Sequence, residues 1–252
     1  MKLLDMFARR DNLPIYTASK TRPPDWLLSL IIMTELRYES FTPNHIRVAR
    51  HAQSFSEPVQ LAIHAAAFAI FQELPQQYST IIAIEVLLAI YLIWTSIQML
   101  LRYRTSPSLF GPLYLADSLG GFWSETWHNA FASPCESLAY RPIRYGLAAL
   151  GVPTVLARSA GILGAFTLMA VFHMYTLQPV LPAGNIWRIG AFFVLNGVAT
   201  MVEGAIWGRK RHWVKAVLAW GFELGLATWT VQTAHIPKGL GQIPWLDMCE
   251  RF

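Results

Sequence analysis

Two stretches of the sequence, FWSETWHN at residues 122–129 and GILGAFTLMAVFHMY at residues 161–175, decide how the fold is interpreted. Each contains a histidine beside aromatic side chains, and His173 stands deep in an apolar run. An ionisable side chain held at membrane depth costs free energy, so it indicates a function by default. We expect the rest of the chain to form a membrane scaffold that brings His128 and His173 together.

The composition indicates a protein of the lipid bilayer. Hydrophobic residues make up 54% of the 252 residues and charged residues only 14%, against roughly 25% charged residues in an ordinary soluble domain. Ten tryptophans can serve as anchors at the membrane interface. The net charge of +5 lies in short basic tracts beside apolar runs, which is typical of membrane orientation, so we expect no nucleic-acid partner.

The chain offers little for a disulfide framework or a metal site. Cys135 and Cys249 are its only cysteines, and none of its seven histidines forms a pair at metal-ligand spacing. We therefore expect no metal. Residues 1–24 are basic but lack the apolar core of a secretory signal peptide, so we expect them to form an exposed tail.

Apolar runs predict an all-α, polytopic transmembrane helical bundle of about five spans. A helix needs about twenty apolar residues to cross a bilayer. The expected spans are residues 59–74, 80–101, 159–178, 186–207 and 213–232, the first of them marginal in length. With five spans, every basic tract falls on one side of the membrane, as the positive-inside rule requires. This cytosolic side would hold the N-terminus and the region around Phe122.

The runs outside the spans suggest two parts. Residues 25–36 are too short to cross a bilayer and predict a helix at its interface, so residues 1–58 would form a cytosolic basic tail with an interfacial helix. Residues 59–252 would form the membrane domain, with its core motifs at residues 110–178. Within it, residues 118–145 mix aromatic and polar side chains, as helices do when they lie at the interface or line a cavity.

Two further patterns concern packing inside the bundle. The Gly-x-x-x-Gly spacing, which favours close packing of helices, occurs at residues 204–208 and 221–225. The acidic side chains inside the expected spans, which we expect to pair with basic groups, are Glu85, Glu203 and Glu223.

Five short motifs follow one another between residues 122 and 173. They are Phe122-Trp123 with Trp127-His128, Arg141 to Arg144, Leu150 to Pro153, Ala157 to Gly161, and Phe172-His173. In this order they resemble the wax-synthase branch of the membrane-bound O-acyltransferases, strongly over residues 110–178 and more faintly upstream. The chain resembles a short and divergent member, because Ser124-Glu125-Thr126 and Met174 depart from the usual family pattern.

The resemblance implies transfer of an acyl group from a coenzyme A thioester to a hydroxyl group inside the membrane. The donor would be acyl-CoA, with acetyl-CoA among the candidates. The acceptor would be a lipophilic alcohol such as a fatty alcohol, a sterol or a terpenoid-type natural product, and the endoplasmic reticulum would be the expected membrane. The resemblance also implies His173 as the catalytic base and His128 as its partner.

The chemistry of the residues fits such a reaction. A neutral imidazole can accept the proton of an alcohol at neutral pH, and burial keeps an imidazole neutral. His128 or Asn129 could donate a hydrogen bond to the oxyanion that forms when the thioester is attacked. The candidates for substrate binding are Trp123, Trp127, Arg141 and Arg144.

Each assignment has an alternative. Either histidine could serve packing alone, with its ring bonded to a neighbouring carbonyl. Arg141 and Arg144 could bind the phosphates of coenzyme A or only fix the orientation in the membrane. For the whole protein, the alternatives are a donor-independent cyclase or isomerase acting on an isoprenoid, and a non-catalytic membrane protein. The sequence specifies neither the acyl chain length nor the oligomeric state.

Overall fold

The computed structural model describes residues 1–35, 37–44, 55–101, 107–208, 210 and 212–232. The tail expected from residue 234 and Cys249 lie outside these ranges. The helical elements are α1 (Lys2–Ala8), η1 (Arg10–Asn12), α2 (Asp25–Thr34), α3 (Glu57–Gln72), α4 (Ser79–Leu100), η2 (Leu113–Leu115), α5 (Leu119–Gly121), η3 (Phe122–Thr126), α6 (Ala132–Cys135), η4 (Glu136–Tyr140), α7 (Arg141–Ala149), α8 (Thr154–Leu177), α9 (Ala183–Trp207) and α10 (Trp213–Val231). Two short strands, β1 (Ile15–Tyr16) and β2 (Phe41–Thr42), pair antiparallel. The expected all-α class is confirmed.

Three described helices, α4, α8 and α9, are long and apolar enough to cross a membrane. They confirm the spans expected at residues 80–101, 159–178 and 186–207. α8 begins at Thr154, because the fixed φ angle of Pro153 at the N-cap sets the direction in which the chain enters the helix. α3, with 16 residues, and α10, which contains Lys215 and Glu223, fall outside this set, so their crossing stays a prediction.

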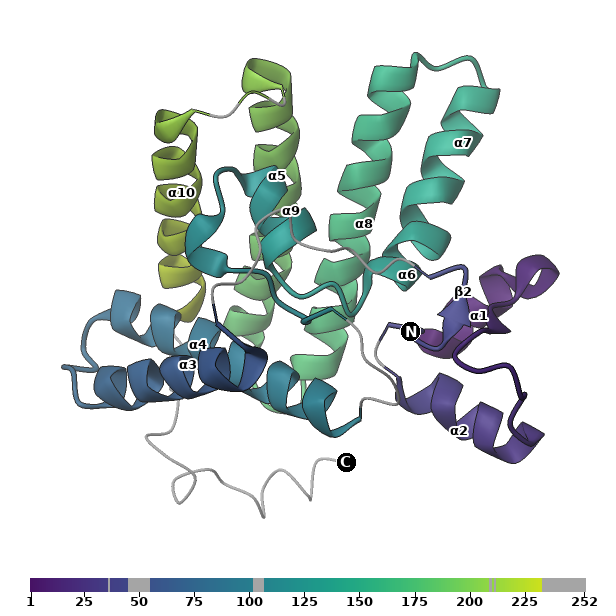
Figure 1. Cartoon of the computed structure of the whole chain (residues 1–252). Coiled ribbons are helices and arrows are strands. Elements are labelled where there is room, and N and C mark those ends of the chain that lie inside the picture. Colours follow the sequence, from purple (N-terminus) through teal and green to yellow (C-terminus); the bar gives the residue numbers. More distant parts are fainter. Residues whose placement is uncertain (36, 45–54, 102–106, 209, 211, 233–252) are drawn as a thin grey trace.

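The helices form two groups that run in different directions. α7, α8, α9 and α10 stand side by side, whereas α3 and α4 run crosswise at one end of them (Figure 1). α8 packs against α7 and α9, and α10 packs against both α9 and α4. Because α4 crosses the direction of α8 and α9, the three candidate spans do not share one axis, and at least one of them is strongly tilted in a flat bilayer. The segment α5–η3 lies against α9 and α10.

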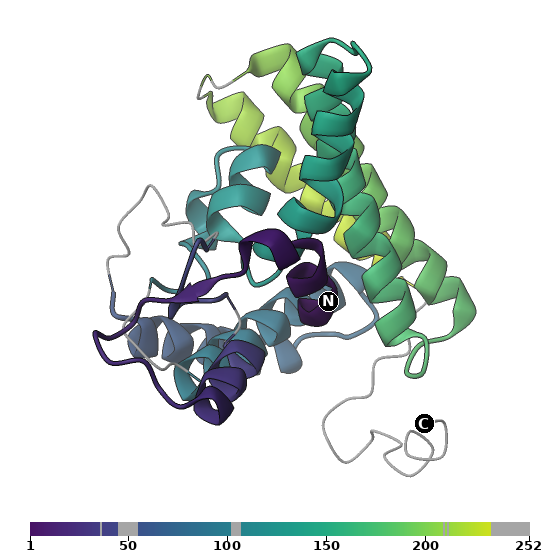
Figure 2. The same ribbon diagram turned by 90° about the vertical axis from the view of Figure 1, so that its right-hand side faces the viewer.

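The first residues of the chain are folded against the helices. α1 packs on α6 and η4, as Figure 2 also shows. Its fully buried Asp5 accepts a hydrogen bond from Oγ of Ser133 at 2.8 Å and another from Ser137. The expectation of an exposed tail was therefore wrong for α1, although Lys20 and Arg22 are exposed. The prediction failed because Asp5 finds its partners far away in the sequence.

Close helix contacts occur at other glycines than expected. A Cβ added at Gly204, Gly221 or Gly225 would meet nothing within 4 Å, so the prediction from the Gly-x-x-x-Gly spacing was wrong. A Cβ at Gly161 would lie 2.9 Å from the ring of Tyr140, and one at Gly197 would lie 2.9 Å from Cβ of Phe166. These glycines let α8 approach the η4–α7 segment on one side and α9 on the other.

The three acidic side chains of the expected spans have different surroundings. Glu203 lies 3.6 Å from Nζ of Lys215, as expected. Glu85 instead accepts a hydrogen bond from Nε2 of Gln76 at 2.6 Å. Oε1 of Glu223 is buried and has no hydrogen-bond partner in the described part of the chain. Pairing with a basic group is thus confirmed only for Glu203.

Candidate active site

A buried acid fixes the start of the segment that carries the two tryptophans. Glu203 of α9 accepts hydrogen bonds from the backbone N–H groups of Leu119 (2.7 Å) and Gly120 (3.2 Å), where α5 begins. The first N–H groups of a helix have no partner within the helix, and a carboxylate there is favourable. Glu203 therefore caps the start of α5 and holds the α5–η3 segment, which leads to the two tryptophans, against α9.

Trp123 and Trp127 belong to the packing around η3. Nε1 of Trp123 donates to Oδ1 of Asn196 in α9 at 3.2 Å. Trp127 is only 8% exposed and stacks on Phe122 with ring centroids 5.4 Å apart. Their rings form a continuous aromatic cluster that includes His128, whose ring centroid is 5.3 Å from that of Trp127.

His128 lies in the loop between η3 and α6, surrounded by aromatic rings. The rings of this aromatic surround, with centroids between 5.3 and 5.9 Å from that of His128, belong to Trp94, Phe110, Trp127 and Phe131. Nδ1 of His128 is buried and has no hydrogen-bond partner within the described residues. Burial, together with a smaller contribution from the charge of His173, lowers the pKa of His128 to about 3. The ring is therefore neutral at physiological pH.

His173 lies in the last turns of α8 with one ring nitrogen bonded and the other available. Its Nδ1 is 2.8 Å from the carbonyl oxygen of Met169. A carbonyl oxygen only accepts hydrogen bonds, so Nδ1 carries the proton and Nε2 keeps its lone pair. The ring of His173 therefore does bond a neighbouring carbonyl through Nδ1, as the alternative of a packing role predicts. That bond leaves Nε2 as the basic atom.

The two histidines meet at Phe131. The ring centroid of Phe131 is 5.9 Å from that of His128 and 6.3 Å from that of His173. His173 also stacks on Phe193 of α9 at 4.3 Å, which fixes the ring plane. The structure therefore brings together the two histidines that the sequence motifs single out, one from a loop and one from α8.

The segment that contains this pair is related to known acyltransferases. Residues 106–195 match the membrane bound O-acyl transferase family. The predicted resemblance is thereby confirmed for the part of the chain that carries both histidines.

The chain is also homologous to plant proteins with curated names. "Probable long-chain-alcohol O-fatty-acyltransferase 9" of Arabidopsis thaliana is 31% identical over 121 residues, 45% of this chain and 35% of that protein. The "long-chain-alcohol O-fatty-acyltransferase" of Simmondsia chinensis is 31% identical over 126 residues, 48% of this chain and 36% of that protein. "Probable long-chain-alcohol O-fatty-acyltransferase 7" of Arabidopsis thaliana is 24% identical over 201 residues, 75% of this chain and 58% of that protein.

Coverage of these relatives is partial. The chain spans 35%, 36% and 58% of the length of the three plant proteins. No solved structure matches the chain.

Within the O-acyl transferase segment, the two arginines lie apart from the histidine pair. Arg141 forms an exposed ion pair with Glu136 at 2.9 Å, and Arg144 donates to the hydroxyl of Tyr140 at 3.0 Å. Tyr140 packs against Gly161, which precedes His173 by 12 residues of α8, or roughly 18 Å of helix. The structure does not bring these arginines to the histidines.

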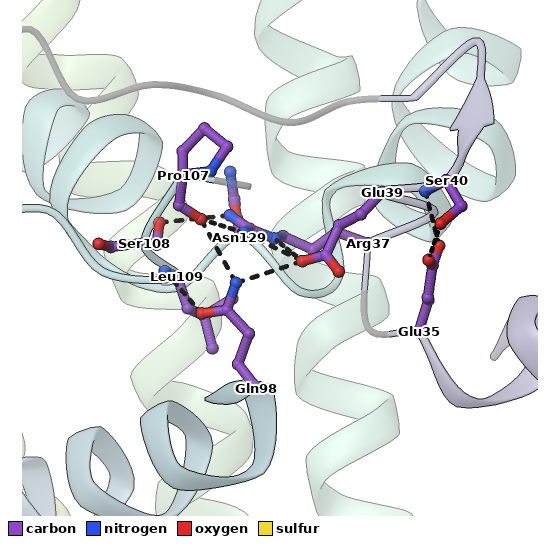
Figure 3. Close-up of polar contacts among 9 residues, drawn as sticks. All are labelled: Glu35, Arg37, Glu39, Ser40, Gln98, Pro107, Ser108, Leu109 and Asn129. Carbon is purple, nitrogen blue, oxygen red and sulfur yellow. Dashed lines mark hydrogen bonds and ion pairs between the residues drawn. The ribbon is translucent and has the colours of Figure 1, made fainter. Parts of the chain in front are cut away.

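Asn129 is bonded to a residue that the motifs did not include. Its Oδ1 accepts a hydrogen bond from Nη1 of Arg37 at 3.0 Å (Figure 3). Arg37 is only 3% exposed, and its Nε and Nη2 lie 3.2 and 3.1 Å from Oε1 of Glu39. The signal for this buried pair is a run of alternating charges, Glu35, Arg37 and Glu39, inside an apolar chain.

A cavity of about 100 Å³ lies beside the aromatic surround. Its lining residues are Met1, Lys2, Met33, Thr34, Tyr38, Trp94, Ala130, Phe131 and Pro134. Trp94 and Phe131 also contact His128, so the cavity adjoins the histidine pair at these two rings. Across the described ranges, no group of three or more His, Cys, Asp or Glu side chains could hold a metal ion.

Proposed function

We propose that the protein is a membrane O-acyltransferase that transfers an acyl group from acyl-CoA to the hydroxyl of a lipophilic alcohol, in the membrane of the endoplasmic reticulum. The observation that carries this proposal is the geometry of His173. Its Nδ1 is bonded to a backbone carbonyl, which leaves Nε2 as a base, and its ring and that of the buried His128 both contact Phe131. The family match over residues 106–195 supports the reaction class.

The reaction follows from the states of the two rings. Nε2 of His173 takes the hydroxyl proton while the alcohol oxygen attacks the thioester carbonyl. The neutral ring of His128 carries one N–H, which donates to the oxyanion that forms. The oxyanion then re-forms the carbonyl of the ester as the C–S bond breaks, and the proton passes from His173 to the departing thiolate.

The cavity beside Phe131 supports a short acyl group. It has a volume of about 100 Å³. In our proposal this space takes the end of a short acyl group. We therefore favour acetyl-CoA or another short acyl-CoA as the donor, with the alkyl end of the acyl group beyond the ring of Phe131.

The acceptor reaches the site from the side in this proposal. His173 itself is half-buried on α8, a helix long and apolar enough to cross a membrane. In a bilayer the outer surface of α8 contacts lipid, and the acceptor would reach His173 from that side without passing through water. Fatty alcohols, sterols and terpenoid-type alcohols all meet this condition.

The test is ester formation by membranes that contain the protein. Membranes from cells that express the chain are incubated with isotope-labelled acetyl-CoA and a panel of fatty, sterol and terpenoid alcohols, and the labelled esters are detected by mass spectrometry. We expect labelled ester from at least one alcohol, and none with membranes from cells that lack the protein. A product that forms equally well without any acyl-CoA would show donor-independent chemistry and overturn the proposal.

A further inference from the structure

His128 is held in place without a hydrogen bond of its own in the described structure. Its Nδ1 is buried without a partner, and its contacts are those of the aromatic surround. The position of the ring is therefore determined by the segments that carry these aromatic residues. Three segments do so: α4, the stretch before η2, and the loop between η3 and α6.

Each of these segments has a polar group close to its aromatic residue, and these groups meet (Figure 3). On α4, Gln98 stands one turn after Trp94. In the stretch before η2, Leu109 directly precedes Phe110, and its backbone N–H donates to Oε1 of Gln98 at 3.0 Å. In the loop, Asn129 directly follows His128.

Arg37 bonds the loop and the stretch before η2 directly, and it reaches α4 through Glu39. Its Nη1 donates to Oδ1 of Asn129 at 3.0 Å and to the carbonyl oxygen of Ser108 at 3.3 Å, and its Nη2 donates to the carbonyl oxygen of Pro107. Glu39, which balances the charge of Arg37, accepts a hydrogen bond from Nε2 of Gln98 at 3.2 Å. We call this set the Arg37 network: Arg37, Glu39, Gln98, Asn129 and the backbone of residues 107–109.

We propose that Arg37 is a positioning residue for acyl transfer, because its guanidinium fixes the three segments that hold the ring of His128. Arg37 acts through Asn129 and the aromatic surround and touches no substrate. The proposal rests on the proposed function for its catalytic consequence. Its structural consequence, the protection of the His128 ring, can be measured without any activity.

The planar shape of the guanidinium makes the proposal testable with the charge unchanged. Arginine presents five N–H donors in a rigid plane, whereas lysine presents one ammonium at the end of a flexible chain. Arg37→Lys keeps the charge opposite Glu39 but does not reach Asn129 and the carbonyl groups of residues 107 and 108 together. The variant thus separates the geometry of the network from its charge.

The experiment compares Arg37→Lys with a matched control, Arg188→Lys. Arg188 also donates to a backbone carbonyl, that of Trp229 at 2.7 Å, but it joins α9 to α10. We expect Arg37→Lys to lower kcat by about 10- to 100-fold, since small misplacements of catalytic groups have effects of that order, with KM for both substrates nearly unchanged. Arg188→Lys should keep the kcat of the wild type.

A second measurement, chemical modification of histidine by diethyl pyrocarbonate, needs no substrate. Peptide mass spectrometry gives the rate of modification at His128, with His173 as the internal reference. We expect faster modification of His128 in Arg37→Lys and wild-type rates in Arg188→Lys. An unchanged kcat in Arg37→Lys would overturn the inference. So would a loss of kcat that matches the loss of folded protein while His128 stays protected from modification. If the wild type forms no ester but Arg37→Lys exposes His128, the proposed function fails while the positioning of His128 stands.

Discussion

The Arg37 network and the aromatic surround adjoin at residues 128 and 129, yet they satisfy their polar groups in opposite ways. In the network, the guanidinium of Arg37 has acceptors for Nε, Nη1 and Nη2, and the amide of Gln98 bonds through both its oxygen and its nitrogen. In the aromatic surround, Nδ1 of His128 has no hydrogen-bond partner in the described structure. The neighbouring His173 forms a hydrogen bond through Nδ1 alone.

The difference separates residues that hold the fold from residues that are available for chemistry. Buried polar groups normally have hydrogen-bond partners, so a buried nitrogen without one needs a reason. A completed network is rigid because every bond restrains the others. We therefore propose a structural role for Arg37, Glu39, Gln98 and Asn129, and a chemical role for the two histidines. The predictions below test this division.

The largest effect is expected at the base. His173→Ala removes Nε2, and loss of a general base typically lowers the rate by about 10²- to 10⁴-fold. Ester formation with labelled acetyl-CoA measures this effect, and thermal unfolding in detergent shows whether the variant folds. A folded His173→Ala protein with wild-type activity would remove His173 from the mechanism.

The next effect concerns the choice of acyl donor. Phe131→Ala removes the ring between the cavity and the histidine pair, so the space open to the acyl chain becomes larger. We expect the ratio of rates with octanoyl-CoA and acetyl-CoA to increase. Phe71→Ala on α3, another half-buried phenylalanine, is the control and should leave this ratio unchanged. An unaltered ratio in Phe131→Ala would show that the acyl chain does not enter the cavity.

A smaller effect distinguishes two roles of Asn129. Asn129→Asp keeps the oxygen that accepts from Arg37 but loses the amide donor, whereas Asn129→Leu loses both. If Asn129 serves the Arg37 network, the aspartate variant should retain more activity and thermal stability than the leucine variant. Equal loss of activity in two folded variants would instead indicate that the amide N–H donates to the substrate.

The smallest effect is a dependence of stability on pH. Burial lowers the pKa of His128 to about 3 in the folded protein, whereas an unfolded histidine titrates near 6.5. Below about pH 6.5 the unfolded chain binds the extra proton, so stability falls as the pH decreases toward 3 and is unaffected above that window. His128→Gln should flatten this part of the curve of Tm against pH. An equally steep curve in the variant would show that His128 is not buried as a neutral ring.

Local patterns predicted the parts of this protein that depend on local sequence. Continuous apolar runs gave α4, α8 and α9, and the motif order gave His128 and His173, because both signals lie within short windows. Residues 118–145, which mix aromatic and polar side chains, were expected to lie at the interface or to line a cavity, and they include Phe131 and Pro134 of the cavity lining. The assignment of roles to the individual site residues stays a prediction.

Local sequence patterns could not predict contacts between distant segments. Arg37 bonds Asn129 across 92 residues, and no pattern within either segment names the other. The glycine contacts show the same limit, since the spacing at residues 221–225 matches a packing motif but the close approach to a neighbouring segment is at Gly161. Spacing tells which glycines share a face, whereas the partner helix decides which face is used.

The burial of Asp5 has a consequence for how the chain is assembled during synthesis. Its partner Ser133 follows 128 residues later, after α2, α3 and α4 have been made. α1 therefore leaves the ribosome long before Ser133 has been made. It cannot dock until the later helices have been synthesised. α1 thus reaches its final place only after Ser133, 128 residues further along the chain, has been made.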